Sequence, residues 1–278
     1  MGRRLRALYL ATATGGCFLF FWVGCWLLSW TALPLARLAL RNGSTIDRDR
    51  LCQDLVGWGF RLFIAFMRWL RTLVFVPGKV EFKFPDGPFV LISNHPTLID
   101  VTAILAVYPR ICCVAKTELF HSSWVGRLLR YCGHIEGGSA GPMDGVAVMQ
   151  QALKRLKRGQ PVLIFPEGTR SPDHGLRRFK SGAFEIASRA GVPVVPVYAT
   201  CEPPTLKKNL SWYGLPKKTA CYNLRQLAAP AGDFHAADSR SAAARFQDLY
   251  QAEIDAGRRT QTHVDGVPSA STGRRVVS

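Results

Sequence analysis

A histidine and an aspartate five residues apart stand where an apolar run ends, in the segment Leu91-Ile-Ser-Asn-His95-Pro-Thr-Leu-Ile-Asp100. The pattern predicts a strand that runs into Asn94 and His95, followed by a helix that begins near Thr97. Asp100 would then accept a hydrogen bond from one imidazole nitrogen of His95 and leave the other nitrogen free as a base. The nucleophile would be a hydroxyl of the substrate, so no serine of the protein is required. A purely structural hydrogen bond between these two side chains is the alternative.

A turn that contains glycine and arginine follows a second apolar run. Val162-Leu-Ile-Phe165 predicts a strand, and Pro166-Glu167-Gly168-Thr169-Arg170-Ser171 follows it directly. Gly168 would let the backbone turn tightly and approach a ligand, while Arg170 could hold a phosphate with two hydrogen bonds. Thr169 adds a hydroxyl donor. The segment indicates an anion site, with an ordinary turn and a surface arginine as the alternative.

Short apolar runs alternate with helical runs from Lys79 onward, and these elements must position the two segments. The alternation predicts an α/β domain with a mixed, mostly parallel sheet flanked by helices, in which sites gather at the carboxyl ends of strands. The expected strands are Val80–Phe84, Phe89–Ile92, Ile111–Ala115, Val162–Phe165 and Val194–Ala199. The expected helices are Leu98–Val107, Trp124–Tyr131, Asp144–Arg158, Phe179–Ala190 and Ser241–Ala256.

Two apolar segments precede this domain. The first, Ala7–Ala36, has 30 residues and no charge; it is long enough to cross a bilayer as a helix, and Pro34 should end or bend it. The second, Leu55–Val76, is expected to lie among lipid headgroups or, alternatively, on the domain surface as an ordinary amphipathic helix. It carries three arginines on one helical face: Arg61, Arg68 and Arg71. The two segments predict membrane-associated helices, either with one crossing or with both helices dipping into one leaflet.

The charge of the chain predicts an anionic partner. Lysine and arginine number 36 against 19 aspartate and glutamate, which gives the 278 residues a formal net charge of +17. Residues 231–278 are neutral overall, so the excess lies in residues 1–230. We expect an anionic membrane surface or phosphorylated substrates as partners. We expect no nucleic acid, because the chain has no helix-turn-helix, zinc-finger or RNA-binding signature.

Cysteine spacing and composition suggest a cytosolic body with three regions. The eight cysteines form no C-x-x-C pair, so we expect reduced thiols, no bound metal and no cofactor. The expected regions are membrane-associated helices at residues 1–78, an α/β domain at 79–230 and a C-terminal helix at 231–278. Disorder is expected beyond Gly257.

Three segments, in this order, resemble motifs of the glycerolipid acyltransferase family, in particular its 1-acylglycerol-3-phosphate acyltransferase branch. They are Asn94–Asp100, which fits N-H-x4-D, then Phe165–Ser171 and Val192–Pro196. The resemblance spans about 40% of the chain, from Pro88 to Thr200. It implies membrane-bound helices before an α/β domain, acyl-CoA or acyl carrier protein as the donor, and a lysophospholipid as the acceptor.

The resemblance also implies roles for individual residues. His95 would be the catalytic base, Asp100 its partner and Arg170 a ligand of the acceptor phosphate. The implied substrate-binding residues are Asn94, Glu167, Gly168, Thr169, Arg170 and Lys116. The expected reaction converts 1-acylglycerol 3-phosphate to phosphatidic acid at the inner (cytoplasmic) membrane, with the catalytic domain facing the cytosol.

One stretch departs from the family. The second motif of the family carries an arginine that helps to hold the acceptor phosphate, but the corresponding stretch here reads Gly133-His-Ile-Glu136-Gly-Gly138. Arg127 or Arg130 could replace it, and Lys180 is a further candidate for an anion contact. Two alternatives therefore stay open: an acyltransferase for a different lysolipid or hydroxyl-bearing lipid, and a non-catalytic protein that binds anionic lipids.

Overall fold

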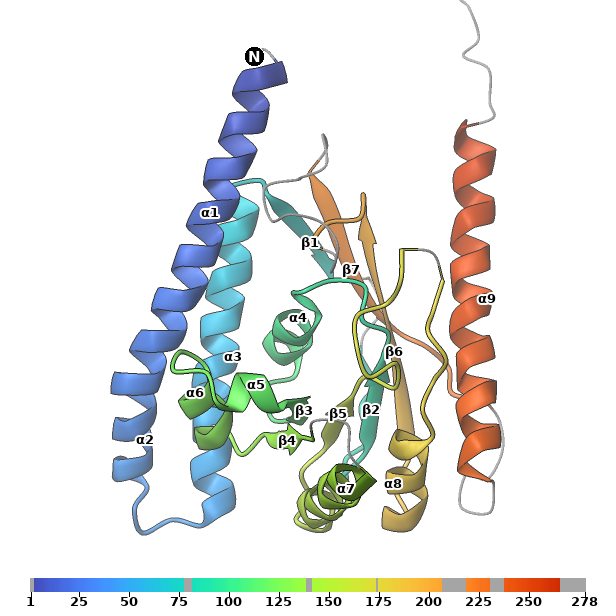
Figure 1. Cartoon of the computed structure of the whole chain (residues 1–278). Coiled ribbons are helices and arrows are strands. Elements are labelled where there is room, and N and C mark those ends of the chain that lie inside the picture. Colours follow the sequence, from blue (N-terminus) through green and yellow to red (C-terminus); the bar gives the residue numbers. More distant parts are fainter. Residues whose placement is uncertain are drawn as a thin grey trace, which may run out of the picture.

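A seven-stranded sheet forms the centre of the molecule (Figure 1). The computed structural model describes residues 3–77, 82–138, 142–173, 175–206, 219–230 and 238–265. The strand order is β1-β7-β6-β2-β5-β3-β4, and all neighbouring strands are parallel except β6 and β7. The predicted α/β class with a mixed, mostly parallel sheet is therefore confirmed. The strands are β1 (Leu73–Pro77), β2 (Val90–Ser93), β3 (Cys112–Lys116), β4 (Ile135–Gly137), β5 (Val162–Ile164), β6 (Val194–Glu202) and β7 (Ala220–Gln226).

Helices cover both faces of this sheet. Successive residues of its central strands point to opposite sides, and the side chains on both sides are apolar and must be buried. Val90 and Ile92 of β2 pack with α7, α8 and α9, whereas Leu91 packs with the N-terminal helices and α4. Figure 1 shows α9 and α1 on opposite sides of the sheet. A strand buried on both faces is apolar throughout, as β2 is. The helices of this body are α4 (Asp100–Val107), α5 (Thr117–Phe120), α6 (Gly126–Tyr131), α7 (Pro142–Lys157), α8 (Gly182–Ala190) and α9 (Ser239–Asp265).

The N-terminal helices form a hairpin beside the body (Figure 1). The first arm consists of α1 (Arg3–Leu27), the π-helical turn η1 (Leu28–Ala32) and α2 (Leu33–Ala39), and the second is α3 (Thr45–Trp69). Pro34 does not end the first arm, because the wider turn η1 directly precedes it and accommodates the missing N–H. The rings of Phe20 and Phe66 stack between the arms with centroids 4.5 Å apart.

The first arm meets the length and composition needed for a membrane span. Among the described residues, Leu8–Ala39 is the helix that is long and apolar enough to cross a bilayer, with 32 residues. Only 17% of the residues in its most apolar stretch are buried within the protein, so most of them keep some exposed surface.

The strand expected at Val80–Phe84 is not observed. Residues 80 and 81 lie outside the described residues, and residues 82–84 are not in a strand. The edge strand is instead β1, which the sequence analysis placed at the end of the helical segment Leu55–Val76. Helix α3 ends at Trp69, Arg71 adopts a positive φ of 50°, and the β-branched run that follows is favoured in strands. Arg71 therefore does not share a helical face with Arg61 and Arg68.

The remaining differences concern element ends and elements that were not expected. The C-terminal helix α9 continues to Asp265, beyond the expected end at Ala256 and into the part expected to be disordered. Strands β4 and β7 were not expected. Because β1 belongs to the sheet, the helical front end stops before residue 73, earlier than the expected boundary at residue 78.

Candidate active site

His95 and Asp100 meet at the carboxyl end of β2, near the centre of the sheet. The strand ends at Ser93, the chain turns through residues 94–99, and α4 begins at Asp100. His95 Nδ1 lies 2.7 Å from Asp100 Oδ2. The Asp100 side chain is fully buried, whereas that of His95 is 18% exposed. The expected pairing is therefore present, with the imidazole at the surface of a cavity and the carboxylate behind it.

Further donors hold the Asp100 carboxylate in place. Its Oδ2 accepts the Thr97 backbone N–H at 2.7 Å, and its Oδ1 accepts the Thr97 hydroxyl at 2.6 Å and the Tyr222 hydroxyl at 2.8 Å. Burial and the negative charge of Asp100 raise the pKa of Tyr222 well above its usual range, so the phenol remains a donor. The sequence analysis missed Tyr222, which lies on β7 and is 122 residues from Asp100. No local motif marks it.

The glycine–arginine turn after β5 is joined to the histidine loop. Glu167 Oε1 accepts the backbone N–H of His95 at 3.2 Å and the Ser171 hydroxyl at 2.5 Å, and Glu167 Oε2 accepts the Arg177 backbone N–H at 2.9 Å. The Ser171 backbone N–H in turn donates to the His95 carbonyl at 2.8 Å. The ring of Phe165 stacks on that of His95, with centroids 4.4 Å apart. The two candidate segments therefore form one unit.

Gly168 is required at the tip of this turn. Its φ is +70°, in the left-handed region that side chains rarely adopt. A Cβ atom there would also lie 3.0 Å from Lys180 Nζ. Lys180 thus lies over the glycine, and its ammonium group adds a positive charge beside the turn.

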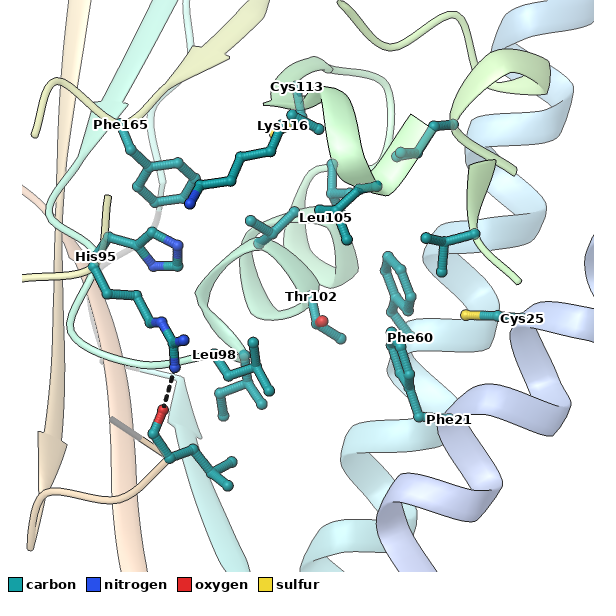
Figure 2. Close-up of a pocket in the computed structure, with 18 of the residues that line it drawn as sticks. Phe21, Cys25, Phe60, His95, Leu98, Thr102, Leu105, Cys113, Lys116 and Phe165 are labelled. Carbon is teal, nitrogen blue, oxygen red and sulfur yellow. Dashed lines mark hydrogen bonds between the residues drawn. The ribbon is translucent and has the colours of Figure 1, made fainter. Parts of the chain in front are cut away.

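A cavity of about 750 Å³ opens in front of His95 and runs between the sheet and the N-terminal helices. Its lining contains the ionisable side chains of His95, Lys116, Glu118 and Arg170, together with Gly168 and Thr169. Figure 2 shows His95, Phe165 and Lys116 facing the aromatic rings of Phe21 and Phe60 across the cavity. The guanidinium of Arg170 donates to the Leu206 carbonyl at 3.2 Å. The rest of the wall is mainly apolar and comes from α1, α3, α4 and β3.

Two of the expected substrate-binding residues use their side chains in hydrogen bonds within the protein. The Asn94 side chain donates to the Ala199 carbonyl at 2.9 Å and accepts the Ala199 N–H at 2.8 Å, which fastens the end of β2 to β6. Both ends of its amide are thus used, and Asn94 is not among the residues that line the cavity. Glu167 is also buried behind the lining, where it fixes the two loops. The structure thus shows protein contacts for both side chains, and substrate binding by Asn94 or Glu167 stays a prediction.

Neither arginine near the departing motif replaces the missing one. Arg127 stacks over Trp30 at 4.0 Å, and Arg130 donates to the Phe120 carbonyl at 2.6 Å. Neither lines the cavity. Lys116 of β3 lies beside the stretch that differs from the family's second motif, because it pairs with Gly137 of β4. Lys116 and Arg170 are therefore the described residues that bring a permanent positive charge to the cavity.

This arrangement can perform general base chemistry on a hydroxyl beside an anion site. The free Nε2 of His95 can take a proton, the two cations can hold a phosphate, and the apolar wall can hold a hydrocarbon chain. Within the described parts of the chain, no three His, Cys, Asp or Glu side chains are grouped closely enough to hold a metal ion.

His95, paired with the buried Asp100 and joined to the glycine–arginine turn, lies at the carboxyl ends of parallel strands. Residues 78–200 match the family described as Acyltransferase. The match covers the part of the chain that holds the three motifs singled out in the sequence.

Particular relatives have more specific names. The 1-acyl-sn-glycerol-3-phosphate acyltransferase BAT2 of Brassica napus is 36% identical over 122 residues, which cover 44% of this chain and 36% of that protein. The human 1-acyl-sn-glycerol-3-phosphate acyltransferase beta is 32% identical over 165 residues, which cover 59% of this chain and 56% of that protein. The chain thus spans between about a third and three-fifths of the length of such relatives.

A solved structure shares the fold over nearly the whole chain. The crystal structure of the 1-acyl-sn-glycerophosphate (LPA) acyltransferase PlsC from Thermotoga maritima superposes with a TM-score of 0.64 and 20% sequence identity. The match covers 92% of this chain and 98% of that chain. The helical front end and the α/β body therefore occur together in another protein.

Proposed function

We propose that the protein transfers a fatty acyl group from acyl-CoA or acyl carrier protein to the free hydroxyl of a lysophospholipid, namely 1-acylglycerol 3-phosphate, to give phosphatidic acid. One observation carries this proposal. The His95–Asp100 pair, the cations Lys116 and Arg170, and an apolar wall surround a single cavity of about 750 Å³. The names of the relatives support the same reaction.

In the proposed mechanism, His95 removes the proton from the acceptor hydroxyl as the oxygen attacks the thioester carbonyl carbon. The new C–O bond forms, the tetrahedral intermediate collapses, and the C–S bond breaks. The departing sulfur takes the proton back from the imidazolium. General base catalysis of this kind contributes about 10²–10⁴-fold, so the alignment of two substrates in one cavity supplies much of the remainder.

The cations and the apolar wall of the cavity are suited to different parts of the substrates. The acceptor phosphate would lie between Arg170 and Lys116, with Lys180 close to the turn. The acyl chain would extend along the apolar wall, away from His95. The glycines at positions 137 and 138 also line the cavity and bring no cation. This favours a second candidate, an acceptor lysolipid with a different headgroup.

The apolar surface of the N-terminal helices supports a membrane location for this reaction. Large apolar side chains are exposed on both arms of the hairpin, and the cavity lies between the hairpin and the sheet. A lysolipid could therefore pass from the bilayer into the cavity without crossing water. We place the protein at the inner (cytoplasmic) membrane with its body in the cytosol, where acyl thioesters are made.

The test is thiol release by the purified full chain, with mass-spectrometric identification of the product. The donors are palmitoyl-CoA and palmitoyl-acyl carrier protein, and the acceptor panel contains 1-acylglycerol 3-phosphate and lysolipids with other headgroups. The His95→Ala variant should lose about 10²–10⁴-fold in rate. The matched control is His121→Ala, because His121 is an exposed histidine that does not line the cavity. If the His95 variant released thiol at the wild-type rate, His95 would not be the base. If the wild type bound lipid without turnover, the protein would be a non-catalytic lipid-binding protein.

A further inference from the structure

Three positive charges lie outside the cavity, beside its glycine–arginine turn. They belong to Arg177, Arg178 and Lys180, which are all exposed, whereas Phe179 between them is buried. None of the three cations lines the cavity. We call residues Arg177–Lys180 the basic segment.

The backbone of the basic segment is fixed on two sides. The Arg177 N–H donates to Glu167 Oε2 of the turn at 2.9 Å. The Phe179 N–H donates to Gln247 Oε1 of α9 at 2.8 Å. The cations are therefore carried by a backbone that is already ordered, so little conformational entropy is lost when they bind an anion.

The basic segment lies next to the rim of the cavity. Gly168 lines the cavity and is itself exposed, so the rim passes over the turn. Lys180 Nζ lies over this glycine, 3.0 Å from the position of a Cβ atom there. Arg177 Nε donates at 3.3 Å to the carbonyl of Arg170, which also lines the cavity. A substrate that leaves the cavity over Gly168 therefore reaches the basic segment.

The acids around this segment leave its charge in excess. Between the turn and α8 the sequence contains three cations and one acid, Asp173. On either side along the chain, Glu167 accepts N–H groups of the two loops, and Glu185 pairs with Arg189 at 2.6 Å. Neighbouring like charges repel one another, and a bound anion removes this repulsion. The segment is thus suited to a ligand with several negative charges.

We infer that the basic segment binds the phosphate groups of coenzyme A, and that the pantetheine arm of the donor leaves the cavity over Gly168. This inference rests on the proposed function and specifies its donor. The thioester would stay beside His95, and the diphosphate and 3′-phosphate would lie outside on the basic segment. Arginine and lysine hold phosphates by charge-assisted hydrogen bonds. Arg170 and Lys116 inside the cavity remain for the phosphate of the acceptor, so the two substrates use different cations.

The segment fits coenzyme A better than a carrier protein. Four consecutive residues span only about 10 Å between the first and the last, which suits a compact polyanion, whereas a specific protein contact covers roughly 800 Å² on each partner. The rim formed by α5 does not extend the basic surface, because Glu118 and Leu119 are the exposed lining residues there. An acid and an apolar side chain would not favour an acidic protein surface.

The experiment compares kcat/KM for palmitoyl-CoA with kcat/KM for S-palmitoyl-pantetheine, which has the same thioester and arm but no phosphate. The wild type should prefer palmitoyl-CoA by about tenfold or more. Arg177→Ala/Arg178→Ala should reduce this preference to about twofold through a higher KM for palmitoyl-CoA, because the phosphates take no part in the chemistry. Arg177→Lys/Arg178→Lys should keep most of the preference, since the charge remains.

The matched control is Lys157→Ala/Arg158→Ala, which removes the same net charge from exposed positions. These residues stand at the end of α7, shortly before β5 begins at Val162, and thus at the edge of the sheet opposite to the carboxyl ends of its parallel strands. The control should keep the wild-type preference. If both double alanine variants lowered the preference equally, net charge alone would explain the effect and the inference would be wrong.

Two further measurements identify the anion. The rate with palmitoyl-acyl carrier protein should fall less in Arg177→Ala/Arg178→Ala than the rate with palmitoyl-CoA, and a larger fall would assign the segment to the carrier protein and overturn the inference. Binding of this variant to vesicles with anionic lipids should stay at least half as strong as that of the wild type. Weaker vesicle binding with an unchanged donor preference would assign the segment to the membrane and also overturn the inference.

Failure of the inference and failure of the proposed function give different results. If the wild type uses both palmitoyl thioesters equally well, the inference is wrong while the proposed function stands. If the wild type transfers no acyl group, the proposed function fails, and calorimetry with coenzyme A and with pantetheine still tests the segment. The wild type should then bind coenzyme A more tightly than pantetheine, and Arg177→Ala/Arg178→Ala should lose most of this difference.

Discussion

Asp100 accepts four hydrogen bonds, and this environment determines how His95 can act. The donors are the imidazole, the backbone and hydroxyl of Thr97, and the phenol of Tyr222. They replace the water that the buried carboxylate has lost, which allows the charge to remain in the interior. With Nδ1 committed to Asp100, the remaining nitrogen of His95 is the one available to a substrate hydroxyl.

Replacement of Tyr222 by phenylalanine tests the contribution of the phenol. The change removes one charge-assisted hydrogen bond to Asp100 and leaves the ring stacked on Phe75. We expect kcat to fall about tenfold with little change in KM, because the aspartate loses one of its constraints. Steady-state kinetics with both substrates would measure this effect.

The control for this change is another buried phenol. Tyr250 is also fully buried, but its hydroxyl lies 2.9 Å and 3.0 Å from the carbonyl oxygens of Ile92 and Val197. Tyr250→Phe should lower the free energy of unfolding by about 1–2 kcal/mol and keep kcat near the wild-type value. Equal losses of kcat in the two variants would show that Tyr222 acts through general stability.

The site could be predicted from the sequence only where its residues are close together in the chain. His95 and Asp100 lie on one strand–turn–helix unit, and Gly168 and Arg170 lie on one turn, so short spacing was sufficient. Tyr222 reaches Asp100 through the order of strands in the sheet, which no local pattern specifies. Asn94 and Glu167 stand beside the chemistry in the sequence, but their side chains satisfy backbone groups, a distinction that depends on three-dimensional contacts.

At the scale of elements, burial decided which predictions succeeded. The central strands β2, β5 and β6 are apolar on both faces, and an uninterrupted apolar run is a strong signal. Strand β1 continues an apolar helix with a gap of only three residues, so composition could not separate the two. Strand β7 alternates polar and apolar residues at its place between β1 and β6, and β4 has three residues. Such short or mixed segments form strands because they pair with adjacent strands of the sheet.

One buried carboxylate contributes to the attachment of the helical hairpin to the body. Asp49 of α3 accepts hydrogen bonds from Arg37 of α2 at 3.2 Å and from Arg155 of α7 at 2.7 Å. Arg37 also donates to the Tyr131 carbonyl at 2.6 Å. These ion pairs and the hydrogen bond to Tyr131 thus connect both arms of the hairpin to α6 and α7 of the body.

Asp49→Asn should therefore destabilise the protein by about 3–5 kcal/mol, because two guanidinium groups lose their buried counter-charge. The matched control is Asp54→Asn on the same helix. Asp54 pairs with Arg110 at 2.8 Å, but the two side chains are 36% and 58% exposed, so solvent screening should limit the loss to about 1 kcal/mol or less. Urea unfolding of both variants in the same detergent provides the comparison. Similar losses would contradict the role of the buried network.

The whole molecule combines a strongly basic body with a large apolar surface on one side. The net charge is +17, and a charge of this sign would favour binding to anionic lipid surfaces. On α3, Trp58, Leu62 and Trp69 are exposed, and at 100° per residue they lie within about 40° of one another. Exposed side chains of α1, η1 and α2 add to the same hairpin. Charge would bring the protein to the membrane, and the apolar surface would keep it there.

The double variant Trp58→Ala/Trp69→Ala separates these two contributions. Trp69 is 75% exposed, so its removal changes little within the folded protein. Each indole that enters the lipid contributes on the order of 1–3 kcal/mol, and binding to vesicles with anionic lipids should weaken at least about tenfold. Val146→Ala is the matched control, because Val146 is an exposed apolar residue on α7, on the other face of the sheet. High salt should weaken the binding of the wild type without abolishing it, since only the electrostatic part is screened. Complete release by salt, or equal binding by the tryptophan variant, would mean that the hairpin does not enter the lipid.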